Sequence, residues 1–323
     1  RATGRNVARY VELDEPYEIT SIGDDRWNAV PLETLDDGPW AFMPEDVQRL
    51  LNRVRGHSVS LGTLASQVFQ GIRTGSNEVY VLEDAVTRGD VLEARSPALG
   101  ERVQVESSLC LRFAAGDQIQ RYELALGDEA LIFPYEDSSG QARLIPLEEL
   151  RVQYPLTYEY FAANEEVLKT RERGRFAKDR GWHRFARQQN LEAIREPKIL
   201  SRDIVSDVAY ALDDDGSVAF VTGYGIRLKT DAHYTRCYLL AILNSRFGDF
   251  ALKQLNTYLR GGYNRIFAQF LEPIPIRQVR FVTPPQKRAE LMAIGTTEAT
   301  EWIETTETRS ADSALGKRST PFS

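Results

Sequence analysis

Cysteine and histidine are scarce in this chain, which has 323 residues but only two Cys and three His. Cys110 and Cys237 lie far apart, each in an apolar run, and no Cys or His pair has the spacing of metal ligands. This usage favours buried, reduced thiols over a disulfide framework. We expect neither a structural zinc nor another metal site.

Long apolar runs are also missing. No stretch approaches the roughly 18 to 20 apolar residues that cross a bilayer, and the opening RATGRNVARY lacks the apolar centre of a secretory signal. We therefore expect no membrane partner and a cytoplasmic location. The chain does not begin with Met, and we expect it to be a piece of something longer.

A general excess of positive charge is absent too, because the formal net charge is -7. The hydrophobic content of 42% is ample for one large domain or two modest ones. Against this acidic background, one segment stands out. Between Lys169 and Arg187 the sequence KTRERGRFAKDRGWHRFAR holds eight Lys or Arg and only two carboxylates, a local charge of +6.

This basic run combines three kinds of side chain that bind nucleic acids. Its cations can hold phosphates, the amides that follow it can pair with adenine, and its aromatic rings can stack on bases. The other interpretation is a solvated, charged surface without a partner. The aromatic members are Phe176, Trp182, His183 and Phe185, and the amides are Gln188, Gln189 and Asn190.

Two glycine and arginine loops have similar chemistry. The segment 70–78, QGIRTGSNE, lies between two expected strands, and its glycines allow close backbone approach to a ligand. Arg73, Thr74 and Asn77 supply donors there, although a plain hairpin loop is the alternative. The segment 260–265, RGGYNR, repeats the theme with Arg260, Tyr263 and Arg265. Together with the basic run, these loops could frame a groove.

The hydrophobic patterns predict an α+β fold with a mainly antiparallel sheet and intervening helices. Helices are expected near 44–55, 147–172, 235–254 and 285–302, and strands between 64 and 134 and between 198 and 229. Asp213–Gly216 is a hairpin signal. We divide the chain into an acidic linker or domain edge (1–40), a main domain (41–280) and a last helix with a polar tail (281–323).

Several segments, in this order, resemble a known family. They are GIRTGSNEVYVL, IQRYEL with ALIFPY, YPLTYEYFAANEEVLKTRERGRF, WHRFARQQNLE with PKIL, and LLAILNSRFGDFAL with GGYNRIFAQFLEPIPI. Over residues 40–280 they resemble the TaqI-like C-terminal specificity domain, the target-recognition part of adenine-N6 DNA methyltransferases and type IIG restriction-modification enzymes. The resemblance implies double-stranded DNA and an upstream methyltransferase domain or subunit as partners.

The family's catalytic domain binds S-adenosylmethionine and carries an Asn-Pro-Pro-aromatic motif, but no Asn or Asp precedes a Pro in this chain. The sole Gly-x-Gly, 223–225, lacks the strand, loop and helix setting of a nucleotide fingerprint. Glu196-Pro-Lys198 fits a metal-dependent nuclease only loosely, and no Ser, His and Asp grouping suggests a triad. We expect no catalytic residue and no cofactor in this chain, while the parent would use S-adenosylmethionine, with Mg²⁺ as a further candidate.

Two functions follow. The first is sequence-specific DNA recognition for a catalytic domain absent from this chain, and six neutralised phosphates would give a slope of log affinity against log salt of about -5. The second is a protein-interaction or specificity-subunit scaffold that does not itself bind DNA. The expected phosphate contacts are Arg171, Arg173, Arg175, Lys178, Arg184 and Arg187. The expected base or groove contacts are Arg73, Asn77, Gln188, Gln189, Asn190 and Arg265, with Thr74, Arg260 and Tyr263 beside them.

Overall fold

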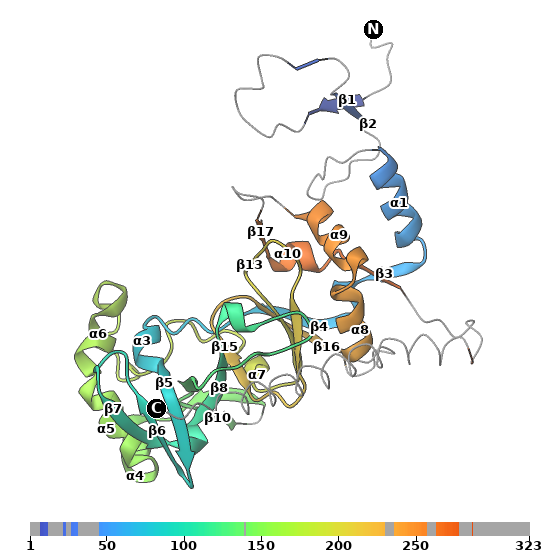
Figure 1. Cartoon of the computed structure of the whole chain (residues 1–323). Helices are drawn as coiled ribbons and strands as arrows, with labels where there is room; N and C mark the ends of the chain where they lie inside the picture. Colours follow the sequence, from blue (N-terminus) through green and yellow to red (C-terminus); the bar gives the residue numbers. More distant parts are fainter. Residues whose placement is uncertain are drawn as a thin grey trace, which may run out of the picture.

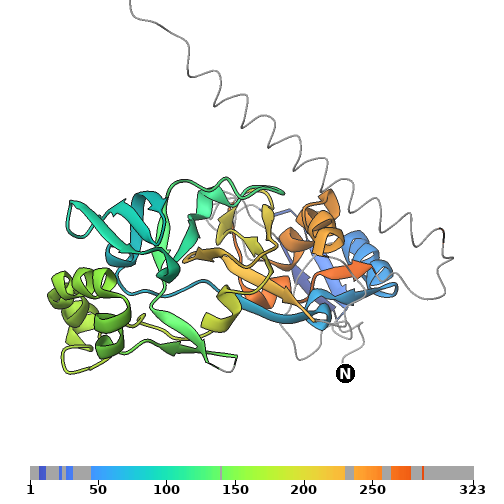
Figure 2. The same ribbon diagram turned by 90° about the horizontal axis from the view of Figure 1, so that it is seen from below.

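The computed structural model describes residues 7–11, 22–23, 27–31, 45–138, 140–229, 236–256, 263–277 and 286. Helices and mostly antiparallel strands alternate along the chain, which confirms the predicted α+β class. The elements form two lobes, seen in both views (Figures 1 and 2). Each lobe has its own hydrophobic core.

One lobe, called the first, contains the first core and is built around a six-stranded sheet. All its neighbouring strands are antiparallel except the parallel pair of β15 and β8. Three helices pack at the same end of the molecule (Figure 1). In sheet order the strands are β15 (Val218–Phe220), β8 (Cys110–Ala114), β9 (Ala130–Ile132), β5 (Val81–Arg88), β6 (Val91–Arg95) and β7 (Arg102–Glu106), and the helices are α4 (Leu147–Gln153), α5 (Pro155–Ala163) and α6 (Glu165–Gly174).

A four-stranded antiparallel sheet separates the two cores. Side chains alternate across a strand, and in β12 Ile199 packs into the second core while Leu200 packs into the first. The strands in order are β14 (Tyr210–Asp213), β12 (Lys198–Ser201), β16 (Tyr224–Leu228) and β4 (Ala65–Gln70). The second core also contains residues of α2 (Leu61–Leu64), α8 (Arg236–Leu243), α9 (Arg246–Leu255) and α10 (Ala268–Leu271).

Smaller pairs and helices complete the described part of the chain. The two-stranded sheets are β1 (Val7–Tyr10) with β2 (Asn28–Pro31), β3 (Ser58–Ser60) with β18 (Pro275–Arg277), β10 (Tyr135–Ser138) with β11 (Gln141–Leu144), and β13 (Ile204–Val205) with β17 (Asn264–Arg265). The remaining helices are α1 (Glu45–Arg55), α3 (Asn77–Tyr80), α7 (Leu191–Ile194) and two 3-10 turns, Ser107–Leu109 and Gly116–Gln118.

Several predicted elements are confirmed: α1 within 44–55, α8 and α9 near 235–254, although α9 ends one residue later, and strands in most of the expected segments. The segment EVYVLED is an exception, because its first residues belong to the short helix α3 before β5 begins. The expected helix at 285–302 and the polar tail lie outside the described residues, apart from residue 286. The domain boundaries at 40 and 280 stay predictions.

The single helix expected over 147–172 is wrong, because three shorter helices occupy this stretch. Tyr154 precedes Pro155 and has non-helical dihedral angles, as the proline ring requires of its neighbour. Asn164 separates α5 from α6. Within α6 the backbone leaves the helix at Arg171, and the next residue, Glu172, has a left-handed conformation.

The hairpin expected around Asp213–Gly216 is also wrong. The turn exists, with Gly216 at a φ of +70°, but β14 and β15 enter different sheets. Asp213 directs the chain there, because its carboxylate accepts the backbone N–H groups of Ser217 and Val218 at 3.2 Å each. The same carboxylate forms a fully buried ion pair with Lys198. This pairing places Lys198 in the protein interior, where its ammonium is bound to Asp213 and is not available to a nuclease site.

Candidate nucleic-acid interface

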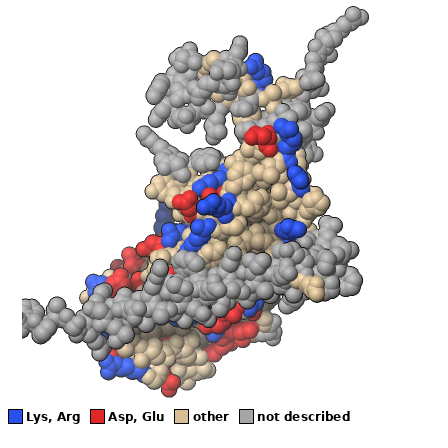
Figure 3. Space-filling model, turned by 45° about the vertical axis from the view of Figure 1, so that its right-hand side comes forward, with Lys and Arg blue, Asp and Glu red and all other residues tan. Residues whose placement is uncertain are grey.

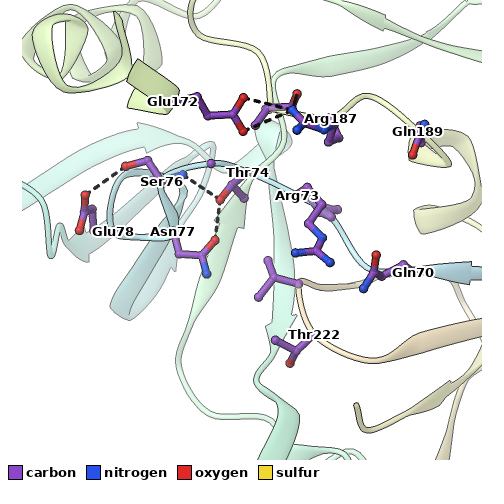
Figure 4. Close-up of a pocket in the computed structure, with 14 residues that line it drawn as sticks. Gln70, Arg73, Thr74, Ser76, Asn77, Glu78, Glu172, Arg187, Gln189 and Thr222 are labelled. Carbon is purple, nitrogen blue, oxygen red and sulfur yellow. Dashed lines mark hydrogen bonds and ion pairs between the residues drawn. The ribbon is translucent and has the colours of Figure 1, made fainter. Parts of the chain in front are cut away.

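A pocket of about 840 Å³ opens where the first glycine loop meets the end of the basic run (Figure 4). Residues 70 and 72–78 form one wall, residues 186, 187 and 189 another, and Val221 and Thr222 lie at the base of the loop. Glu172 completes the lining. Two segments that the sequence singled out separately therefore share one cavity.

Backbone hydrogen bonds hold the loop against the run. Arg73 and Arg187 form an antiparallel bridge, in which the Arg187 N–H donates to the Arg73 carbonyl at 3.1 Å. The Ala186 N–H donates to the Thr74 carbonyl at 3.0 Å. Gly75 makes this approach possible, since a Cβ built there would lie 2.7 Å from that of Ala186 and its φ is +80°. The position therefore requires glycine.

The prediction that Arg171 contacts a phosphate is wrong. Its side chain is only 8% exposed. The guanidinium donates to the carbonyls of Thr74 (3.0 Å), Trp182 (2.9 Å) and Arg184, and to the Tyr80 hydroxyl at 3.1 Å. These groups belong to the glycine loop, the first core and the basic run. Arg171 therefore joins the two segments from inside and is not available to a phosphate.

The expectation that aromatic side chains of the basic run stack on bases is also wrong, because all four of them are buried. Phe176 and Phe185 are 0% exposed, Trp182 5% and His183 1%. The ring of Phe185 packs edge-on against Tyr80, with centroids 5.0 Å apart. Cations spaced between them can still face outward because this stretch is made of turns rather than a regular helix. The aromatic side chains anchor the run to the core, and they are not stacking surfaces for bases.

His183 shows how apolar these surroundings are. Burial lowers its pKa, although the hydrogen bond from Nε2 to the Ile145 carbonyl at 2.8 Å works in the opposite direction. Tyr80 is equally enclosed, and burial raises its pKa to about 12. Both side chains are therefore neutral near pH 7. Neither side chain adds to the positive charge of the run.

Four expected phosphate contacts are exposed: Arg173, Arg175, Lys178 and Arg187. Glu172 pairs with two of them, at 3.1 Å to Arg175 and 3.1 Å to Arg187. The hydrogen bond from Arg187, aided by that from Arg175, lowers the pKa of Glu172. Glu172 is thus ionised near neutral pH and partly balances the cations around it.

Arg184, the sixth expected phosphate contact, is committed to a local ion pair. Its guanidinium donates to Asp179 from Nε at 3.1 Å and from Nη2 at 2.5 Å, and it also lies over the Phe176 ring. Partial burial works to raise the pKa of Asp179, but the Gly181 N–H and Arg184 outweigh it and lower that pKa overall. Arg184 is half-buried and thus less accessible than its neighbours.

The amides after the run are placed differently from one another. Gln188 and Gln189 are exposed, and Gln189 lines the pocket. Asn190 instead has a left-handed backbone before α7, and its Oδ1 accepts a hydrogen bond from Gln67 at 2.6 Å. Asn190 thus binds the run to β4.

The second loop is described only in part, since Arg260 lies outside the described residues. Tyr263 is 50% exposed. Arg265 is exposed in β17, 3.7 Å from the Asp203 carboxylate. Burial raises the pKa of Tyr224, and the charges of Arg265 and Arg73 act to lower it.

The pocket lining includes residues that were not among the predicted contacts, of which Gln70, Glu172 and Thr222 are examples. Gln70 begins the glycine segment, and Glu172 is a rare carboxylate among cations, so both had a signal. Thr222 had none, because it reaches the pocket through the pairing of distant strands. Lys and Arg are interspersed with Asp and Glu on the face drawn in Figure 3. Attraction for a polyanion therefore depends on local patches.

Other chemistry finds no support in the part of the chain that the structure describes. There, no group of three or more His, Cys, Asp or Glu side chains is placed to hold a metal ion. The helices among those same residues are too short or too polar to cross a bilayer. The pocket is therefore the strongest candidate site.

Comparison with known proteins agrees with the resemblance seen in the sequence. Curated relatives include the type II restriction enzyme and methyltransferase RM.Eco57I of Escherichia coli, 22% identical over an alignment of 291 residues that covers 85% of this chain and 28% of that protein. The type II methyltransferase M.PaeR7I of Pseudomonas aeruginosa is 24% identical over 250 residues, 77% of this chain and 39% of that protein. The chain thus spans well under half the length of both relatives.

A comparison with protein families matches residues 112–276, just over half of the chain, to the TaqI-like C-terminal specificity domain. The match contains the basic run, β12 to β16 and the second glycine loop, while the first glycine loop precedes it. This protein belongs to the TaqI-like C-terminal specificity domain family.

Proposed function

We propose that this chain is the DNA target-recognition region of an adenine-N6 DNA methyltransferase or of a type IIG restriction-modification enzyme. Catalysis, with S-adenosylmethionine, would belong to a domain outside these residues. The chain would hold double-stranded DNA in one register, so that a chosen adenine reaches the distant active site. Family membership and the two restriction-modification relatives support this proposal.

The observation that carries the proposal is the bridge between Arg73 and Arg187. It brings an arginine of the glycine loop and an arginine of the basic run to one pocket. The exposed cations Arg173, Arg175 and Lys178 lie in the same run beyond the pocket. Phosphate contacts fix register and base contacts give specificity, and this surface has side chains suited to both.

The acidic character of the whole chain fits the same account. With a net charge of -7, most of the surface repels a polyanion. Binding then requires the basic run, and other orientations on the duplex are disfavoured. A uniformly basic protein would lack this restriction on orientation.

A gel-shift titration with the whole chain tests the proposal. Random-sequence duplex at low salt should be shifted weakly, and selection from a duplex pool with a randomised centre should enrich one consensus. Arg173→Gln should weaken binding to all duplexes alike, because it removes a phosphate contact. If no duplex is shifted at low salt, the alternative scaffold that binds only protein is correct instead.

A further inference from the structure

We propose that the pocket between the glycine loop and the basic run reads guanine, with Arg73 and Asn77 as the discriminating side chains. This inference rests on the proposed function, because it names the base that the DNA-binding surface selects. Four features of the pocket lead to it: an arginine with uncommitted donors, an oriented amide, two carboxylates that offset the positive charge, and a rigid backbone.

Arg73 presents its guanidinium to the pocket (Figure 4). The side chain is exposed and makes no hydrogen bond or ion pair with any residue that the structure describes. Its backbone is fixed, since the Arg73 carbonyl accepts from Arg187 and the preceding Ile72 N–H donates to Phe220 at 2.8 Å. A guanidinium offers donors in a planar fork and no acceptor. Arg73 thus has a fixed backbone and a guanidinium whose donors are uncommitted.

Asn77 is oriented by a short chain of hydrogen bonds. The Ser76 N–H donates to Thr74 Oγ1 at 3.2 Å, and the Thr74 hydroxyl in turn donates to Asn77 Oδ1 at 2.5 Å. This bond turns Oδ1 toward Thr74, so that Asn77 presents its Nδ2 donors on the other side of the amide (Figure 4). The paired contact of an asparagine with adenine needs both the amide oxygen and the amide nitrogen. Asn77 in this orientation therefore does not favour adenine.

The charges of the pocket favour a base over a phosphate. Its lining contains Arg73 and Arg187 but also Glu78 and Glu172, so that its formal charge is zero. Glu78 is held by the Ser76 hydroxyl at 3.2 Å, and Glu172 by Arg187. A phosphate in this space would lie beside two carboxylates and gain little. An uncharged base edge meets no such repulsion.

The donors of Arg73 and Asn77 distinguish among the four bases. Guanine presents two adjacent acceptors, O6 and N7, in the major groove, and arginine paired with both is the commonest specific contact to DNA. Adenine and cytosine would turn an amino donor toward the donors of Arg73 and Asn77. Thymine offers a single acceptor beside a methyl group. Only guanine offers two acceptors to these donors and turns no amino group toward them.

The test begins with the consensus that the whole chain selects from duplexes with a randomised centre. Binding is then measured on the consensus duplex with each guanine replaced in turn by adenine or by 7-deazaguanine, which lacks the N7 acceptor. The wild-type chain should lose roughly 5- to 140-fold at one guanine when it becomes adenine. The same guanine should be the one that is sensitive to 7-deazaguanine.

Two variants locate the effect. Arg73→Gln should lose that discrimination, because glutamine has both a donor and an acceptor and can pair with adenine. Arg173→Gln removes the same charge from a residue that does not line the pocket, and it should weaken all duplexes alike. Asn77→Asp replaces the donors by an acceptor at constant size, and it should reduce the same preference. Thermal unfolding of each variant verifies that it is folded.

Three outcomes overturn the inference. A consensus made of A·T pairs alone leaves no guanine to read. A uniform loss with Arg73→Gln, matching that of Arg173→Gln, makes Arg73 a phosphate contact. In both cases DNA recognition itself stands. If the chain shifts no duplex at all, this inference and the proposed function fail together.

Discussion

Replacing Arg171 by alanine separates an internal role from a contact with DNA. After the change, the Thr74 carbonyl keeps a second donor, the Ala186 N–H at 3.0 Å, and the Arg184 carbonyl shares the Tyr80 hydroxyl, at 3.2 Å, with the His183 carbonyl at 2.8 Å. The Trp182 carbonyl loses the donor that Arg171 gave it at 2.9 Å. A buried carbonyl without a partner costs about 1 to 3 kcal/mol.

The guanidinium of Arg171 also lies 4.2 Å from the centroid of the Phe176 ring. A desolvated contact of this kind contributes about 2 kcal/mol. Together with the lost hydrogen bond, Arg171→Ala should lower the free energy of unfolding by about 3 to 5 kcal/mol. Urea unfolding followed by circular dichroism measures this change directly.

Arg173→Ala is the matched control, two residues along the same run and exposed. It should change stability by less than about 0.5 kcal/mol and weaken DNA binding at all sequences. The opposite pattern would refute the assignment of Arg171. If Arg171→Ala unfolds like the wild-type chain and reduces only the salt dependence of DNA binding, then Arg171 is a phosphate contact after all.

Three further changes have distinct expected results. Glu172→Gln frees two paired arginines, so affinity for random duplex in a gel shift should rise about 3- to 30-fold; weaker binding would contradict this. Asp213→Ala strands the buried Lys198 ammonium and should cost about 3 to 5 kcal/mol in urea unfolding; an unchanged midpoint would show that the pair is dispensable. The lowered pKa of His183 means that the folded state binds fewer protons than the unfolded state. Its contribution to stability is therefore complete above about pH 6.5 and falls as the pH drops through that value; His183→Gln should flatten this part of the stability profile, and an identical profile would exclude His183 as the cause.

Regular periodicity made part of the fold predictable. The helices α1, α8 and α9 have continuous patterns without internal proline, and they occur where the sequence places them. Long-range pairing was not accessible in the same way. The turn at Gly216 is present, yet only tertiary structure reveals that the strands on its two sides enter different sheets.

The candidate site was predictable in its segments and less so in its residues. The glycine loop and the basic run both line the pocket. Their contact depends on the bridge between Arg73 and Arg187, which no local spacing encodes. Within the run, cations and aromatic residues alternate without a helical period, so sequence alone could not tell that Phe176 faces the core or that Arg171 is buried with it.

The central claim is that exposed cations of the basic run bind DNA phosphates. Its most direct test is the affinity of the whole chain for duplex DNA as a function of salt. With Arg171 buried, Arg184 paired to Asp179 and Arg187 inside the neutral pocket, three exposed contacts remain, Arg173, Arg175 and Lys178. They predict a slope of log affinity against log salt of about -2.7 rather than -5. An affinity that does not change with salt would contradict the account.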